Sequence, residues 1–107
     1  NVYKNNDNIT RYRIRKDGFT SIYSKNGYFI IEVPIRSNYY INYKTENNGY
    51  IEIEFLDNNR NILQETIRLD GDEQGKKIYY ERNNQTQHND IYIKILLYEG
   101  HVYSITY

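Results

Sequence analysis

The sequence predicts an all-β fold, namely an antiparallel, jelly-roll-like β-sandwich of about eight or nine strands. Two patterns lead to this prediction. Apolar and polar residues alternate with a period of two along most of the chain, and turn signals rich in Gly, Asn and Asp recur at intervals of roughly 8–12 residues. A third observation excludes a helical fold, because no segment repeats apolar residues at positions i, i+3, i+4 and i+7.

The first half of the chain is expected to form four strands after a polar, aperiodic linker or disordered end at residues 1–8. Strands and the turns that follow them are predicted at 11–15 (turn 16–18), 19–23 (turn 25–27), 28–35, and 39–45 (turn 47–49). The turn Lys25-Asn26-Gly27 carries the Asn-Gly signal of a β-hairpin. Pro34 has no N–H for a ladder, so we expect it at a sheet edge or a strand end.

The second half is expected to form the remaining strands of a single domain that spans residues 9–107. Strands, turns and loops are predicted at 50–56 (turn 57–59), 61–67 (loop 70–75), 77–82 (loop 83–90), 91–98 (turn 99–100) and 101–107. Residues that alternate toward one face should form the core between two sheets. The predicted core consists of Ile51, Ile53, Phe55, Ile91, Ile93, Ile95, Tyr103 and Ile105.

Composition narrows the function classes. Lys and Arg together number 14, as do Asp and Glu, so the formal net charge is zero. The chain therefore has no excess of positive charge of the kind that binds nucleic acid. No apolar run approaches the ~20 residues of a membrane span. The chain contains no Cys, which excludes disulfides and thiolate metal sites, and no Met, which leads us to expect a piece of a longer or processed protein.

Four segments carry a resemblance to a known family. They are RIRKDGF (13–19), YYINYKTENNGYIEIEFLDNN (39–59), LDGDE (69–73) and IKILLYEGHVYSITY (93–107). In this order they resemble the β-sandwich domain that follows a five-bladed propeller in many bacterial glycosidases of the invertase and arabinanase type. The best anchors are Asp17-Gly18-Phe19 and Val102-Tyr103-Ser104. Tyr79-Tyr80 stand where relatives usually carry a Trp.

The resemblance implies a non-catalytic accessory domain of a larger, secreted or cell-surface protein. Such a domain would pack against an adjacent domain of the same polypeptide, and the catalytic carboxylates of the family lie in the propeller. The alternative is an independent carbohydrate-binding or adhesin-type module. An enzyme is the third class, for which the sequence offers only the pair Glu52 and Glu54 on one strand face, a spacing that any solvent-facing strand shows.

Two sets of residues are candidate binding sites. One set consists of tyrosines whose aromatic rings could stack on sugar rings, namely Tyr39, Tyr40, Tyr79 and Tyr80. Half-buried strand tyrosines whose hydroxyl groups contact solvent show the same sequence pattern. One member of each adjacent pair must face outward in an extended strand. Asp70, Asp72 and Glu73 are candidate oxygen ligands for a structural calcium ion, while a solvated turn at Gly71 is the simpler interpretation. His88 and His101 lie in no catalytic motif.

Overall fold

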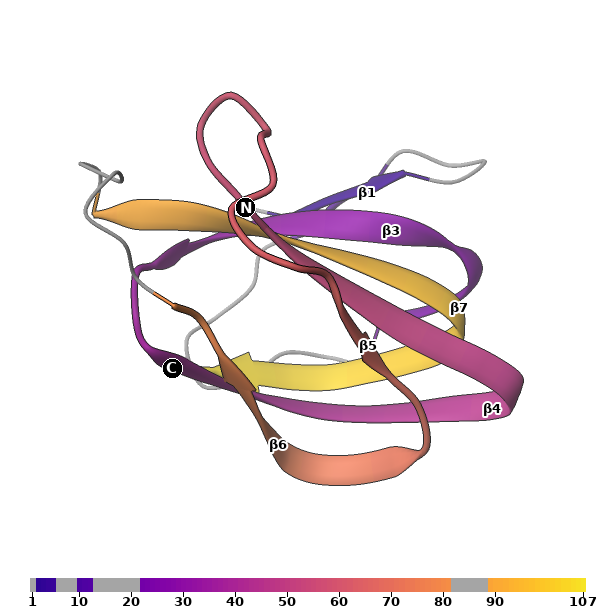
Figure 1. Ribbon diagram of the computed structural model, residues 1–107. Helices are drawn as coiled ribbons and strands as arrows, with labels where there is room; N and C mark the ends of the chain where they lie inside the picture. Colours follow the sequence, from indigo (N-terminus) through magenta and orange to yellow (C-terminus); the bar gives the residue numbers. More distant parts are fainter. Residues whose placement is uncertain (1, 6–9, 13–21, 82–88) are drawn as a thin grey trace.

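The computed structural model describes residues 2–5, 10–12, 22–81 and 89–107. This part of the chain forms seven strands and no helix, which confirms the predicted all-β class (Figure 1). The strands are β1 (Val2–Asn5), β2 (Thr10–Tyr12), β3 (Ile22–Pro34), β4 (Asn38–Leu56), β5 (Ile67–Leu69), β6 (Asp72–Tyr79) and β7 (Asp90–Thr106). Strand β1 lies within the stretch that was predicted as a linker, and it pairs with β3.

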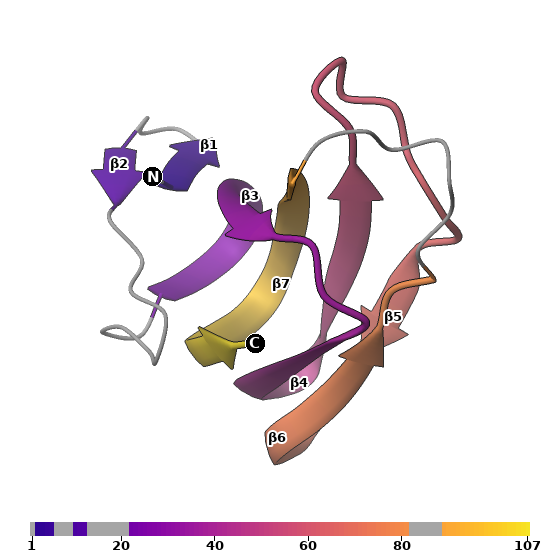
Figure 2. The same ribbon diagram turned by 90° about the vertical axis from the view of Figure 1, so that its left-hand side faces the viewer.

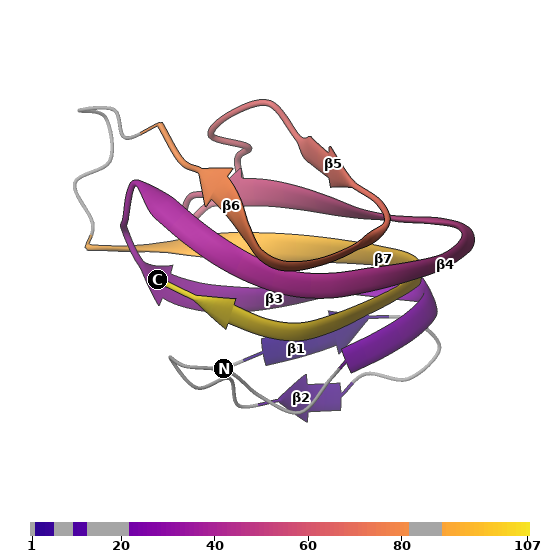
Figure 3. The ribbon, with the colours of Figure 1, turned by 90° about the horizontal axis from the view of Figure 1, so that it is seen from below.

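All described strands belong to one antiparallel sheet with the order β2–β1–β3–β7–β4, and β4 is bordered on its other side by β5 and β6. Three long strands, β3, β7 and β4, form its centre. Figures 1 and 3 show that these strands curve back on themselves, so that each contributes to both halves of the folded sheet. Figure 2 shows β5 and β6 toward one edge of the sheet, where they border different parts of β4, and β1 and β2 at the other edge.

The three central strands change direction at the same level of the sheet, which we call the crease and define by Lys25 of β3, Glu99 of β7 and residues 46–49 of β4. On one side of the crease, Gly100 of β7 pairs with Ser24 of β3 and with Thr45 of β4. On the other side, Tyr98 of β7 pairs with Asn26 of β3 and with Tyr50 of β4. Within the crease, Asn47 and Glu99 have positive φ angles of 55° and 47°. One side of the crease, the β6 half, contains β6, and the other, the β5 half, contains β5 and β1.

The predicted turns at 25–27, 47–49 and 99–100 therefore fall at the crease, and the prediction that they reverse the chain is wrong. An Asn-Gly hairpin turn needs positive φ at both central residues. Neither Asn26 nor Gly27 has one, and β3 keeps its pairing with β7 as far as Pro34. At each of these three positions the strand bends and then continues into the other half of the sheet. The expected strand end at Pro34 is confirmed.

Elsewhere the predicted boundaries shift. The turn at 57–59 is confirmed, since the Asp57 carboxylate accepts hydrogen bonds from the backbone N–H of Asn59 and Asn61 at 2.8 and 2.9 Å. Most of the predicted strand 61–67 is a loop, and β5 begins only at Ile67. Strand β6 begins at Asp72, inside the predicted loop 70–75. Residues 13–21 and 82–88, which include Asp17-Gly18-Phe19 and most of the predicted loop 83–90, lie outside the described residues.

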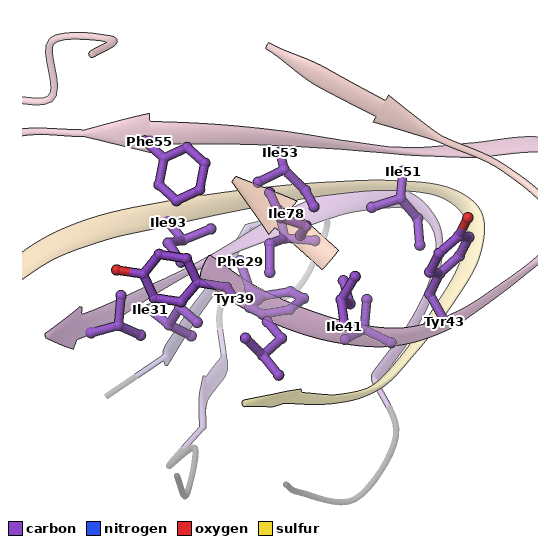
Figure 4. Close-up of a cluster of buried hydrophobic side chains, with 14 of the residues drawn as sticks. Phe29, Ile31, Tyr39, Ile41, Tyr43, Ile51, Ile53, Phe55, Ile78 and Ile93 are labelled. Carbon is purple, nitrogen blue, oxygen red and sulfur yellow. The ribbon is translucent and has the colours of Figure 1, made fainter. Parts of the chain in front are cut away.

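The core lies between the two halves of the folded sheet. Figure 4 shows Ile51, Ile53 and Phe55 on one half of β4 facing the other half of the same strand. The rings of Tyr39 and Phe55 meet across this space with centroids 5.7 Å apart. Seven predicted core residues are buried, namely Ile51, Ile53, Phe55, Ile91, Ile93, Ile95 and Ile105.

Tyr103 is the exception, because 39% of its surface is exposed. Asn42 pairs with Ser104, whereas the next residue, Tyr43, pairs with Val102. Tyr103 is thus the extra residue of a β-bulge, which shifts the alternation of β7 by one position. Val102 occupies the inward position, and the prediction that Tyr103 belongs to the core is wrong.

Three tyrosines of the described residues are buried in this core, and their hydroxyl groups differ in hydrogen bonding. The Tyr39 hydroxyl donates to the carbonyl oxygen of Pro34 at 2.6 Å and accepts from the N–H of Arg36 at 2.9 Å. Burial raises the pKa of Tyr39 to about 12. The Tyr43 hydroxyl donates to the carbonyl oxygen of Asp70 at 2.7 Å. The Tyr80 hydroxyl is buried without a hydrogen-bond partner in the described structure.

We expect Tyr39→Phe to lower the free energy of unfolding by about 1–3 kcal/mol, because the Pro34 carbonyl and the Arg36 N–H lose their partner. Tyr80→Phe removes a hydroxyl that has no partner, so we expect no loss and a gain of up to about 1 kcal/mol. Urea denaturation of both variants measures the difference. Equal losses in the two variants would contradict this assignment of the hydroxyl groups.

Candidate functional site

Exposed tyrosine rings gather on the outer surface of the β6 half. Tyr23 of β3, Tyr103 of β7, Tyr40 of β4 and Tyr79 of β6 are 42%, 39%, 38% and 58% exposed. The four strands are neighbours in the sheet, and the register places Tyr23 at the level of Lys44 and Tyr79 at the level of Asn38. Three strand spacings across the sheet and six residues along β4 make this a diagonal row that spans roughly 25 Å. We call these four residues, together with His101, the tyrosine face.

Strand alternation explains why these rings point outward. Tyr40 lies between the buried Tyr39 and Ile41, and Tyr79 lies between the buried Ile78 and Tyr80. Because successive side chains in a strand point to opposite faces, the neighbours fill the core while Tyr40 and Tyr79 face solvent.

His101 connects two of the rings on this face. Its ring centroid lies 4.4 Å from that of Tyr23 and 5.9 Å from that of Tyr103, and the ring planes of His101 and Tyr103 differ by only 9°. His101 Nε2 is 2.8 Å from Oε2 of Glu46, which belongs to the crease. The hydrogen bond with His101 lowers the pKa of the Glu46 carboxyl. His101, bonded to the crease through Glu46, thus contacts both tyrosine rings, stacked on Tyr103 and tilted by 40° against Tyr23.

Small polar side chains lie between the rings. Asn42 alternates outward between the buried Ile41 and Tyr43, and Ser104 is directly opposite it on β7. Thr106 is directly opposite Tyr40. Directly opposed residues share a face of the sheet, so an amide and two hydroxyl groups accompany the tyrosine rings.

A pocket of about 320 Å³ adjoins Tyr79 at one end of the tyrosine face. Its lining residues are Gln64, Glu65, Thr66, Ile67, Tyr79 and Glu81. The Gln64 side chain holds the two walls together, since its Nε2 donates to the carbonyl oxygen of Tyr79 at 3.1 Å and its Oε1 accepts from the N–H of Glu81 at 3.0 Å. Tyr79 is therefore shared by the face and the pocket.

The four tyrosines predicted from the sequence separate into two classes. Tyr40 and Tyr79 face outward, as expected for one member of each pair, while Tyr39 and Tyr80 are 0% and 1% exposed and belong to the core. Sequence reasoning did not single out Tyr23, although its place between Ile22 and Ser24 in an alternating strand was a usable signal.

The predicted calcium ligands do not come together. The described residues contain no group of three His, Asp or Glu side chains placed to hold a metal ion. The Glu73 carboxylate lies 3.0 Å from the Tyr43 hydroxyl and 3.9 Å from Lys76 Nζ, so it already has protein partners. Burial, followed by the hydrogen bond with Glu73, raises the pKa of Tyr43 to about 12. Asp70 and Asp72 flank Gly71, whose φ is 93°.

The other candidates from the sequence lie apart from the tyrosine face or outside the described residues. Glu52 and Glu54 are on the outer surface of the β5 half, where Glu54 pairs with Lys94 at 3.8 Å. His88 lies in the segment that the structure does not describe. Among the described residues, no helix is long and apolar enough to cross a membrane.

Comparison with family models, with curated proteins and with solved structures found no match to this chain.

Proposed function

We propose that this chain is a non-catalytic accessory domain of a larger, secreted glycoside-hydrolase-like protein, and that it contacts carbohydrate through the tyrosine face. In this proposal the two halves of the folded sheet act as the layers of a jelly-roll-like β-sandwich. The observation that carries it is the gathering of Tyr23, Tyr40, Tyr79 and Tyr103 on one outer surface. Exposed apolar rings that cluster, rather than scatter singly, mark an interaction surface.

The chemistry of the face suits a neutral saccharide. A sugar ring offers C–H groups to a tyrosine ring and hydroxyl groups to amides and hydroxyls. The face supplies both, with Asn42, Ser104 and Thr106 placed between the aromatic rings. Among the described residues, the contact between His101 and Glu46 joins the ionisable side chain of this face to a protein partner. Stacking on tyrosine needs no charge on the ligand.

A second candidate is an independent carbohydrate-binding or adhesin-type module. The tyrosine face supports it equally, because the face is open on the surface of the domain itself. The two candidates differ in the neighbouring domain: the accessory role requires stable docking to an adjacent propeller, whereas the independent module binds glycan with no such contact. Co-purification of this chain with a separately expressed propeller from the same polypeptide distinguishes them.

We expect the isolated chain to bind a neutral oligosaccharide of glucose, arabinose or fructose with a Kd on the order of 10⁻⁴ M. Tyr40→Ala and Tyr79→Ala should each weaken binding by about twofold to twelvefold, since an aromatic contact contributes about 0.5–1.5 kcal/mol. Amide chemical shifts during titration measure the affinity. Raising the salt concentration to about 0.5 M should change it little, because no charged contact is involved.

Tyr98→Ala provides the matched control. Tyr98 is 39% exposed, like the rings of the tyrosine face, but it lies on the β5 half and stacks on Tyr50 with centroids 5.3 Å apart. This variant should bind as the wild type does. Equal weakening by Tyr98→Ala and Tyr40→Ala, or no binding to any saccharide, would remove the tyrosine face as the carbohydrate site.

A further inference from the structure

The pocket beside Tyr79 differs from the rest of the tyrosine face in the groups that it leaves free. The Gln64 amide is occupied on both sides by backbone groups of residues 79 and 81. The Thr66 hydroxyl donates to Glu54 Oε2 at 3.4 Å. The amide and the hydroxyl of the lining thus already have protein partners. Among the described residues, no hydrogen bond or ion pair engages the side chains of the other polar lining residues, namely Tyr79, Glu65 and Glu81.

Glu65 and Glu81 give this pocket a local negative charge in a chain whose formal net charge is zero. The ion pairs of the described residues join Lys76 to Glu73, Lys94 to Glu54 and His101 to Glu46, so neither pocket carboxylate is neutralised by them. An ionised carboxylate only accepts hydrogen bonds. A ligand that fits must therefore donate hydrogen bonds, and a positive charge improves the fit.

We propose that the pocket binds the free ammonium group of an amino sugar. An ammonium group carries three donors and no acceptor, which complements the Glu65 and Glu81 carboxylates. A cation is also attracted to the face of an aromatic ring, and Tyr79 presents the most exposed tyrosine ring among the described residues. This inference rests on the proposed saccharide binding, since the sugar ring lies on Tyr79 while its amino group reaches the carboxylates.

The test compares a glucosamine trisaccharide with the corresponding N-acetylglucosamine trisaccharide. The two have the same sugar rings, but acetylation removes the charge and leaves one N–H donor. We expect the 107-residue chain to bind the free amine at least tenfold more tightly at low salt. About 0.5 M salt should abolish most of this difference while leaving the binding of the acetylated sugar nearly unchanged, because screening acts on the charged contact.

Glu65→Gln and Glu81→Gln should each reduce the preference for the free amine, and the double variant should remove it. Glu52→Gln is the matched control, because this outward-facing carboxylate is not among the residues that line the pocket. Isothermal titration provides the affinities, and thermal unfolding checks that each variant is folded. A double variant that keeps the tenfold preference overturns the inference.

Failure of this inference is distinguishable from failure of the proposed function. Equal binding of the amine and its acetylated form, weakened by Tyr79→Ala, overturns the ammonium site and keeps the saccharide face. Absence of binding to both sugars overturns both. Lysine amide that binds as tightly as the glucosamine trisaccharide overturns the assignment to a sugar, because the amine alone would then account for recognition.

Discussion

Ile53→Ala should lower the free energy of unfolding by about 2–5 kcal/mol. Ile53 is 0% exposed and pairs with Ile95 of β7 on one side and with Ile67 of β5 on the other. Truncation removes apolar contacts and leaves a cavity that the neighbouring strands, fixed by their ladders, cannot close. Ile95→Ala should have an effect of the same size, and urea denaturation monitored by circular dichroism measures both.

Glu52→Ala is the control for this prediction, because Glu52 precedes Ile53 and points to the opposite face of β4. Its replacement should change stability by less than about 0.5 kcal/mol. A larger loss from Glu52→Ala than from Ile53→Ala would mean that the facing of β4 is inverted, since a shift of one residue moves every side chain to the other surface.

Gly49→Ala should destabilise the fold by about 3 kcal/mol. Gly49 lies in the crease, where a Cβ atom at this position would meet the backbone oxygens of Glu99 and Glu46 at 2.7 and 2.8 Å and that of Tyr98 still closer. Backbone atoms cannot move aside as a side chain can, so the crease must open and the pairing of β4 with β7 must adjust. Thermal unfolding, combined with amide exchange at the crease, reports both effects.

Gly100→Ala is the comparison for this variant. Gly100 is also buried in the crease region, but the nearest atom to an added Cβ is Cγ1 of the Ile51 side chain at 3.1 Å. A side chain can rotate by a few tenths of an ångström, so we expect a cost below that of Gly49→Ala. If Gly100→Ala were the more damaging variant, close approach of the backbone at Gly49 would not be what requires glycine there.

Local alternation predicted much of what is local in this structure. The burial of Ile51, Ile53 and Phe55 follows from a period of two, and so does the outward direction of Tyr40 and Tyr79 beside buried partners. These assignments need only an extended strand with one apolar face. The alternation failed at Tyr103, because a bulge depends on the register with the partner strand. Here Asn42 of β4 pairs with Ser104 and Tyr43 pairs with Val102, which leaves Tyr103 unpaired. The sequence of β7 alone gives no sign of this.

The crease could not be predicted from any one segment. Lys25-Asn26-Gly27 carries the signal of a hairpin turn, and only its pairing with β7 shows that the strand continues. The tyrosine face depends on the same long-range arrangement. Tyr23 and Tyr79 are far apart in the sequence, and the order β3–β7–β4–β6 brings them to one surface.

The central place of β7 has a consequence for the order in which the molecule can assemble. β7 follows both β3 and β4 in the sequence, yet it lies between them and forms ladders with both. Without it the other described strands form two separate groups, β2–β1–β3 and β4 with β5 and β6, and no described ladder joins these groups. During synthesis on the ribosome, therefore, the sheet cannot close until β7 has emerged. Until then β3 and β4 expose long unpaired strand edges, which can bind chaperones or pair with other chains and aggregate.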